Sequence, residues 1–136
     1  NKYNDMQVVQ NLTFPSGANS ATITNAGKAE SKGFEIEATA VPTDGLTLTG
    51  SLAYLDAEFI EYDTRALDSS GNLVPVSFAG NRLMNAPRWS ASSGVNWEGR
   101  VGPGELNIGA QYSYTSSKFT SVTNLPSELV PSIELV

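Results

Sequence analysis

Two glutamates are the first residues whose spacing could support catalysis. Glu35 and Glu37 stand two positions apart, so in a β-strand their carboxylates share one face, as general acid–base chemistry would require. The sequence contains no His and no Cys, which removes the commonest general base and metal ligand and any disulfide framework. A polar, wet strand face explains this pair better, so we predict a chain that is not an enzyme, with no catalytic residues and no cofactor.

Acidic residues gather in one stretch, which raises the question of a cation site. Carboxylates are the ligands that Ca²⁺ prefers, and such a group could also bridge a cation to lipopolysaccharide, but no ligand loop of defined spacing is present. A solvated acidic loop is the simpler interpretation, and no metal site is predicted. The residues in question are Asp56, Glu58, Glu61, Asp63 and Asp68.

Two arginines are the candidates for holding an anionic small molecule. Arg82 and Arg88 each present a planar fork of N–H donors that suits carboxylates and similar anions. Arginines in such places also bridge loop carboxylates or extend toward a membrane interface. Both interpretations stay open, and the identity of a ligand cannot be read from the sequence.

The charge balance excludes one class of partner. Eight Lys and Arg residues are scattered singly through a chain of net charge −6, so no basic stripe is present to neutralise phosphates, and nucleic acid is not an expected partner. Charged residues make up only 16%, against roughly a quarter in a typical soluble domain. Small uncharged polar residues take their place, which suits strands between lipid and a crowded polar lumen.

Alternation of apolar and polar residues with period two predicts strands. Four segments show it: residues 33–41, 46–62, 89–98 and 106–115. In the second of them the pattern loosens near Leu55. Weaker patterns predict a fifth strand around residues 3–12 and a sixth that begins near Glu128. No apolar run approaches the ~20 residues of a membrane helix, so any crossing would use strands, which need about 9–11 residues each.

The connections between these strands alternate between short and long. Residues 42–45, Pro-Thr-Asp-Gly, predict a compact turn because Pro presets φ and Asp-Gly tolerates positive φ. Residues 99–104, with Gly-Pro-Gly, predict a second tight reversal. Residues 14–21, 63–85 and 121–127 are expected to be loops, the longest with residues 68–72 at its tip. Short turns on one side and long loops on the other are typical of an outer-membrane meander.

Aromatic residues lie near the expected ends of the apolar face. Trp89 and Trp97 are eight residues apart, which is roughly 26 Å of strand and, tilted by about 40°, roughly 20 Å along a barrel axis, near the ~25 Å apolar band of membrane barrels. We therefore predict that they mark the two membrane interfaces. Tyr54, Tyr112 and Tyr114 are expected near the long-loop ends of their strands, at the outer interface.

A soluble β-sandwich with these aromatics in its core would show the same alternation. The opposite face argues against it, because the alternate positions within residues 90–96 and 107–113 are Ser, Gly, Asn and Gln without charge. If the chain were such a sandwich, its function would be that of a soluble, secreted binding or adhesin-like module that recognises carbohydrate or protein through its loops.

Three motifs, in this order, resemble TonB-dependent outer-membrane receptors. Residues 25–37, which end in Gly-Phe-Glu-Ile-Glu, resemble a barrel strand of that family. Residues 42–46, Pro-Thr-Asp-Gly-Leu, and residues 50–57 resemble the turn and the strand that follow it. Residues 80–89, Gly-Asn-Arg-Leu-Met-Asn-Ala-Pro-Arg-Trp, resemble the element that opens an inward strand.

The resemblance implies an all-β fold, an antiparallel up-and-down meander of about six strands from a larger transmembrane β-barrel of ~22 strands. Residues 1–136 are then a partial barrel domain, incomplete at both ends and without the plug. The implied location is the bacterial cell outer membrane. The implied partners are outer-membrane lipid and lipopolysaccharide, the rest of its own barrel and plug, and the TonB complex through a missing N-terminal part.

The implied function is import of a scarce ligand, such as a siderophore or another nutrient. A passive porin with a smaller barrel is a further alternative.

Overall fold

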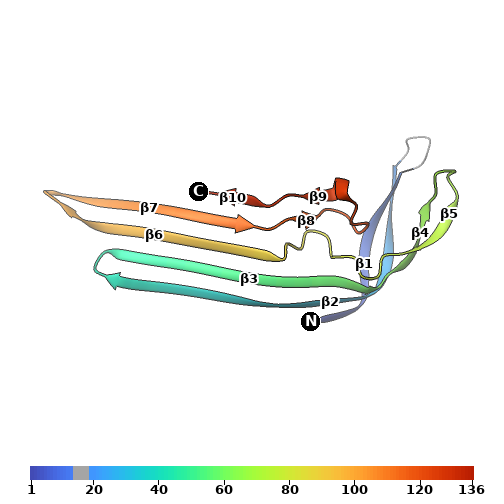
Figure 1. Ribbon diagram of the computed structural model, residues 1–136, viewed down its shortest axis with the longest axis horizontal. Coiled ribbons are helices and arrows are strands. Elements are labelled where there is room, and N and C mark those ends of the chain that lie inside the picture. Colours follow the sequence, from blue (N-terminus) through green and yellow to red (C-terminus); the bar gives the residue numbers. More distant parts are fainter. Residues whose placement is uncertain (14–18) are drawn as a thin grey trace. The chain divides into compact units, whose positions relative to one another are not determined.

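The computed structural model describes the backbone of residues 1–13 and 19–136 and the side chains of residues 1–9 and 27–136. Among the described residues, no helix has the length and apolar character needed to cross a membrane. In the part of the chain that the structure describes, strands dominate, and they are interrupted by the short 3₁₀ turn η1 (Figure 1). The elements are β1 (Lys2–Thr13), β2 (Asn19–Thr43), β3 (Leu46–Glu61), β4 (Asp63–Leu67), β5 (Leu73–Ser77), β6 (Trp89–Val101), β7 (Gly104–Thr115), β8 (Lys118–Phe119), η1 (Pro126–Glu128), β9 (Leu129–Val130) and β10 (Ile133–Leu135).

Six of the strands form one sheet in the order β1-β2-β3-β6-β7-β10. β1 pairs antiparallel with β2, β3 with β6, β6 with β7, and β7 with β10. Neighbours in the sheet therefore follow one another along the chain, apart from the small hairpin β4–β5 and the pair β8–β9, which are inserted between them. The predicted all-β meander of about six strands is confirmed.

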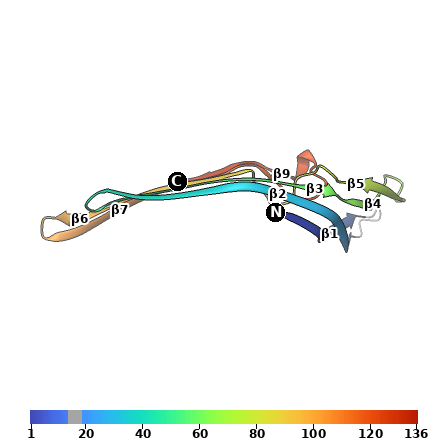
Figure 2. The ribbon, with the colours of Figure 1, turned by 90° about the horizontal axis from the view of Figure 1, so that it is seen from below.

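The two short turns are tighter than the sequence indicates. Only Asp44 and Gly45 separate β2 from β3, and Gly45 has a φ of 78°, a conformation that a residue without a Cβ adopts at little cost. The second reversal was predicted over residues 99–104, but β6 continues to Val101 and β7 begins at Gly104. The β6–β7 hairpin can be followed in Figure 2.

β2 is longer than predicted, because it begins at Asn19 rather than at residue 33. The prediction of a loop over residues 14–21 is therefore wrong at its end, and residues 14–18 of that loop lie outside the described residues. The β1–β2 ladder runs as far as the pair Thr13↔Asn19. A ladder satisfies backbone N–H and C=O groups whatever the side chains are, so it continues through a stretch that lacks clear alternation.

The long loop predicted at residues 63–85 contains a small hairpin of its own, made by β4 and β5. Its tip at residues 68–72 is as predicted: the Asp68 carboxylate accepts hydrogen bonds from the N–H groups of Ser70, at 2.8 Å, and Asn72, at 2.9 Å. The sequence hid β5 because Pro75 stands in its middle, opposite Arg65. Proline lacks the N–H that a central strand needs, yet an edge strand tolerates it.

The last strand of the sheet also begins later than predicted. Glu128 ends the 3₁₀ turn η1, and β10 begins only at Ile133. Pro131 stands between them and has no backbone donor for a ladder. Ile133 pairs with Thr115 and Leu135 with Ser113.

The chain divides into two compact units. The core unit comprises Asn1–Lys32, Asp56–Ala86 and Phe119–Leu129, and the sheet unit comprises Gly33–Leu55, Pro87–Lys118 and Val130–Val136. The core unit holds a hydrophobic cluster in which the Phe59 and Tyr62 ring centroids are 5.0 Å apart and the Tyr62 and Phe78 centroids 5.4 Å apart. Its buried members are Val8, Ala29, Phe59, Tyr62 and Val122, with Met6, Phe78, Leu83 and Met84 packed against them.

Candidate functional site

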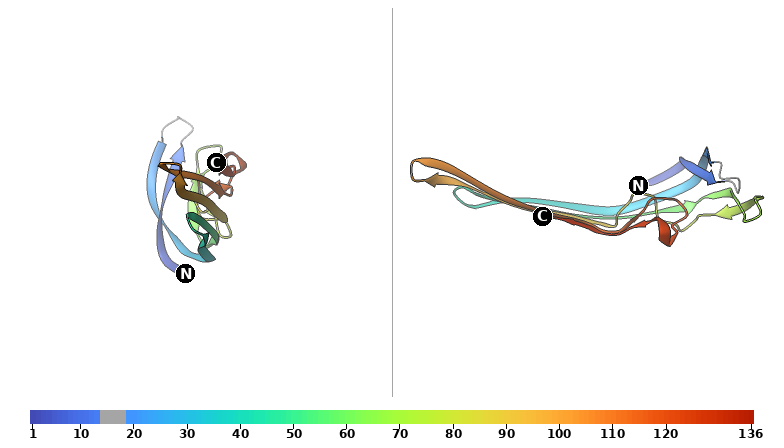
Figure 3. Two further views of the ribbon diagram at one scale, coloured as in Figure 1. Left: turned by 90° about the vertical axis from the view of Figure 1, so that its left-hand side faces the viewer. Right: turned by 90° about the horizontal axis from the view of Figure 1, so that it is seen from above.

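The register of the sheet unit places the apolar side chains of three strands on one face. Directly opposite residues of an antiparallel pair point to the same side, so the pairs Leu48↔Val95 and Val95↔Ala110 form one apolar row across β3, β6 and β7. The neighbouring rows also place apolar side chains on this side of the sheet. Figure 3 shows the three strands from two further directions. This apolar face consists of Leu46, Leu48, Leu52, Tyr54, Trp89, Ala91, Val95, Trp97, Leu106, Ile108, Ala110, Tyr112 and Tyr114.

The apolar face is open rather than packed. Trp89 is 40% exposed, Trp97 36%, Ile108 59% and Tyr112 36%. A β-sandwich would bury these four side chains between two stacked sheets, so their exposure does not fit a sandwich core. An open apolar face of this extent marks a surface that contacts lipid or another protein.

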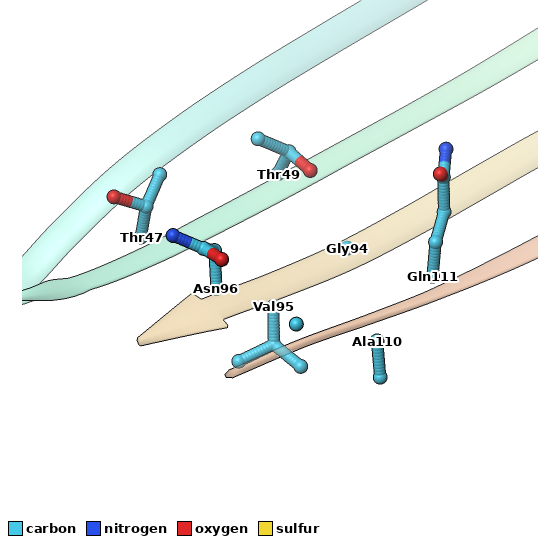
Figure 4. Close-up of a pocket in the computed structure, with 8 residues that line it drawn as sticks. Thr47, Thr49, Gly94, Val95, Asn96, Ala110 and Gln111 are labelled. Carbon is cyan, nitrogen blue, oxygen red and sulfur yellow. The ribbon is translucent and has the colours of Figure 1, made fainter. Parts of the chain in front are cut away.

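The alternate residues of the same strands form a polar face without charge over most of its length. Figure 4 shows Thr47, Thr49, Asn96 and Gln111 projecting to one side of the sheet, and Val95 to the other. The remaining members of this polar face include Ser51 and Ser92, whose hydroxyl oxygens are 2.8 Å apart. A shallow hollow of about 430 Å³ lies among Thr47, Thr49, Gly94, Val95, Asn96, Gly109, Ala110 and Gln111.

Aromatic rings cluster at one end of the β3–β6 ladder. The Tyr54 and Trp89 centroids are 4.7 Å apart, and Phe34 lies 5.9 Å from Tyr54 and 6.1 Å from Trp89. Phe34 was not among the predicted interface aromatics, although its place on the apolar side of residues 33–41 was the signal that could have found it. Tyr54 is opposite Trp89 at this end of the ladder.

The other predicted interface aromatics are spread along the apolar face. Trp97 is opposite Leu46 beside the short turn, at the far end of the ladder from Trp89. Tyr114 is opposite Ala91, close to Trp89, and Tyr112 is opposite Ser93, midway between the two tryptophans.

Arg82 is held by its own surroundings in the core unit. Its backbone N–H donates to Asn124 Oδ1 at 2.8 Å, and its carbonyl accepts from Asn124 Nδ2 at 3.0 Å. The guanidinium donates to the Ala86 carbonyl at 3.0 Å and lies over the Phe119 ring, 5.7 Å from its centroid. Arg82 therefore connects residues 82–86 to the segment 119–124.

Arg88 lies in the sheet unit, so the two predicted arginines belong to different units. Its side chain is exposed. Its carbonyl accepts a hydrogen bond from the Leu55 N–H at 2.9 Å, which attaches the start of β6 to β3.

Three residues that the sequence analysis did not single out hold the segment Phe119–Leu129. Asn81 Nδ2 donates to the Val122 carbonyl at 2.7 Å. The Asn124 side chain forms two hydrogen bonds with the backbone of Arg82. The Glu128 carboxylate accepts hydrogen bonds from the Thr123 hydroxyl and from the Leu125 N–H. No local pattern signals the bonds of Asn81 and Asn124, because their partners lie 41 and 42 residues away.

The acidic residues are not gathered around a cation position. Glu61 accepts a hydrogen bond from Lys28 at 2.8 Å, and the Asn72 and Ser70 N–H groups hold the pKa of Asp68 below its ordinary value of 3.8. Within the described residues, no three His, Cys, Asp or Glu side chains are placed to hold a metal ion. Glu35 and Glu37 are exposed on β2.

The sequence matches the family model described as "TonB dependent receptor-like, beta-barrel" over residues 1–133. The chain belongs to this family. TonB-dependent receptor barrels are proteins of an outer-membrane type that act as receptors and transporters. No curated protein matches the sequence.

A solved structure supports the same assignment. The chain is similar to the siderophore receptor PiuA from Acinetobacter baumannii, with a TM-score of 0.65 and 25% sequence identity. The similarity covers 91% of this chain and 16% of that receptor. The matched part is therefore a small share of that receptor's length.

Proposed function

We propose that this chain forms part of the barrel wall of an outer-membrane receptor that imports a siderophore or another scarce nutrient with energy from the TonB complex. The observation that carries the proposal is the contrast between the two faces of the sheet unit. Val95 and Ile108 leave 41% and 59% of their surfaces open on one side, while uncharged polar side chains line the other. Membrane barrels have this pattern, with lipid outside and a polar lumen inside.

The proposal assigns an environment to each surface of residues 1–136. Lipid and, at the outer leaflet, lipopolysaccharide contact the apolar face. The plug faces the polar face with its hollow, where Thr49 and Gln111 offer neutral hydrogen-bonding groups. The rest of the barrel pairs with the two outermost strands, β1 and β10, because a membrane barrel must leave no strand edge unpaired in the hydrocarbon.

The class of ligand is proposed from the similarity to PiuA, a siderophore receptor. Arg88 is the better of the two arginine candidates for contacting an anionic ligand, since its side chain is exposed. Arg82 is instead proposed to position the loops, because its guanidinium already contacts Ala86 and Phe119.

The test is uptake of labelled ferric siderophores by cells that produce the full-length protein, compared with cells that lack it. Uptake should require the protein and stop when the proton-motive force is collapsed. Uptake that continues without energy would indicate a passive porin and contradict the proposal. A protein that remains dispersed in plain buffer without detergent would instead support the adhesin-like alternative.

A matched pair of variants tests the arginine assignment in the same assay. Arg88→Ala should weaken the apparent affinity for a ferric siderophore while the amount of protein in the outer membrane stays constant. Arg88→Lys keeps the charge but loses the planar fork of donors, so it should recover only part of the affinity. Unchanged affinity in both variants would remove Arg88 from the ligand site.

A further inference from the structure

The indole of Trp97 lies over Gly99. A Cβ atom added to Gly99 would come within 2.5 Å of Cζ2 and 2.7 Å of Cη2 of the Trp97 ring, and within 3.3 Å of Cε2. Distances below 3.0 Å are not reached by real Cβ atoms. The ring therefore occupies the space that a side chain at position 99 would need, and an aromatic ring that covers a strand glycine in this way also shields its backbone.

The position of Gly99 shows the direction in which the ring extends. Residues two apart on a strand share a face, and Gly99 is two positions nearer than Trp97 to the short turn at Gly102. Gly99 is opposite Leu106, and Trp97 is opposite Ile108. The indole thus extends along β6 toward the turn and away from the middle of the apolar face.

This direction matters for a ring with both apolar and polar character. Indoles concentrate at the headgroup level of a bilayer, where the ring contacts the acyl chains and the N–H can bond to water or headgroups. A ring that turned back toward Val95 would lie deeper among the acyl chains. We propose that Gly99 is a positioning residue: by lacking a side chain, it directs the Trp97 indole into the headgroup layer on the short-turn side and so sets the depth of the β6–β7 hairpin.

This inference rests on the proposed membrane function, but it concerns a single contact. Gly50 offers a matched control, since it lies on the same apolar face, opposite Ser93. A Cβ atom added to Gly50 would meet only the Ser92 carbonyl oxygen at 3.8 Å, which is an ordinary contact. Gly99→Ala and Gly50→Ala therefore make the same chemical change with and without a collision.

The experiment uses the full-length protein, labelled with fluorotryptophan and reconstituted in bilayers. The fluorine resonance of Trp97 is the one that disappears in Trp97→Phe. Spin-labelled lipids carry the label either at the headgroup or in the middle of the acyl chain. The headgroup label should broaden the Trp97 resonance more strongly in the native protein and in Gly50→Ala, and Gly99→Ala should lose this preference.

A preference that survives in Gly99→Ala would overturn the inference. If neither label broadens the Trp97 resonance of the native protein, the proposed membrane function itself fails, which is a different outcome.

A double substitution keeps the test decisive if Gly99→Ala does not fold. The variant Trp97→Leu with Gly99→Ala removes the ring that collides with the new methyl group. If it folds as well as Trp97→Leu alone, the collision between ring and methyl is the cause, and the inference is supported. If it fails as Gly99→Ala does, the backbone requires glycine at position 99 for another reason, and the inference falls.

Discussion

The core unit and the sheet unit use the same kind of strand in opposite ways. Every buried apolar residue among the described side chains belongs to the core unit, including Phe59, which is 1% exposed, and Tyr62, which is fully buried. In the sheet unit, by contrast, Trp89 and Ile108 remain 40% and 59% exposed. Fully burying one such side chain stabilises a fold by about 1.5–3 kcal/mol. The core unit gains this energy from its own contacts, whereas the sheet unit would gain it only from a partner that covers its apolar face, which is lipid under the proposed function.

The largest expected effect comes from removing a ring from the core unit. Phe59→Ala should cost about 3–5 kcal/mol of local stability, because it leaves a cavity against Tyr62 and Val122. Hydrogen exchange of the full-length protein should show lost protection in β3 near Phe59 and in residues 119–129. Phe34→Ala, at a residue that is 47% exposed in the sheet unit, is the matched control and should cost clearly less. Equal costs would mean that the two units do not differ in how they are stabilised.

The next effect distinguishes the two faces of the sheet unit. Val95→Lys places a charge on the apolar face and should cost about 2–4 kcal/mol if that position lies near the middle of a bilayer. Thr49→Lys places the same charge on the polar face and should cost much less. Denaturant titration of the protein in lipid bilayers measures both. If the two substitutions cost the same, the faces share one environment and the barrel assignment fails.

A smaller effect is expected at the connection between Asn124 and Arg82. Asn124→Ala removes three hydrogen bonds, to the N–H and carbonyl of Arg82 and to the carbonyl of Ser121, and should cost about 1–3 kcal/mol. Proteolysis within residues 119–129 is the measurement.

Asn124 also has a φ of 52°, a left-handed conformation that costs alanine conformational energy. Asn124→Gly removes the same bonds without that strain, so it should cost less than Asn124→Ala. A glycine variant as resistant to proteolysis as the native protein would show that the hydrogen bonds contribute nothing.

The smallest effect is a pH dependence at Glu128. Partial burial raises the pKa of its carboxyl. Hydrogen bonds from Thr123 and Leu125 together lower this pKa by a larger amount, so the net pKa is below the ordinary 4.5. A depressed pKa stabilises the folded form above pH 4.5, and this stability is lost as the pH falls from 4.5 through the lower folded value. Protection of residues 119–129 should therefore weaken in that window. In Glu128→Gln the same window should show no such change, and a change of equal size there would assign the effect to another group.

Local chemistry made much of the sheet unit predictable. The face of each residue in β6 and β7 followed from alternation, and the register confirms it through pairs such as Val95↔Ala110 and Trp97↔Ile108. The turn at Asp44-Gly45 followed from residue types that tolerate positive φ. Both signals arise from interactions within a few residues, which a sequence displays directly.

The core unit was less predictable because its contacts join distant segments. β5 contains Pro75, and a proline within a segment argues against a strand. The β1–β2 ladder extends through residues without clear alternation. The bonds from Asn81 and Asn124 join the segments of Asn81–Arg82 and Val122–Asn124. The predicted arginine Arg82 consequently proved to contact Ala86 and Phe119.

The sequence by itself determined that the chain is built from hairpins with one apolar and one polar face, because alternation and turn chemistry depend on neighbouring residues. Only the tertiary structure decided which apolar side chains are covered by the protein. Phe59 and Ile108 are both apolar residues of β-strands, yet one is buried and the other is open. The difference depends on whether a distant segment, such as the one that carries Val122, closes over the strand, and alternation within a strand does not encode that long-range contact.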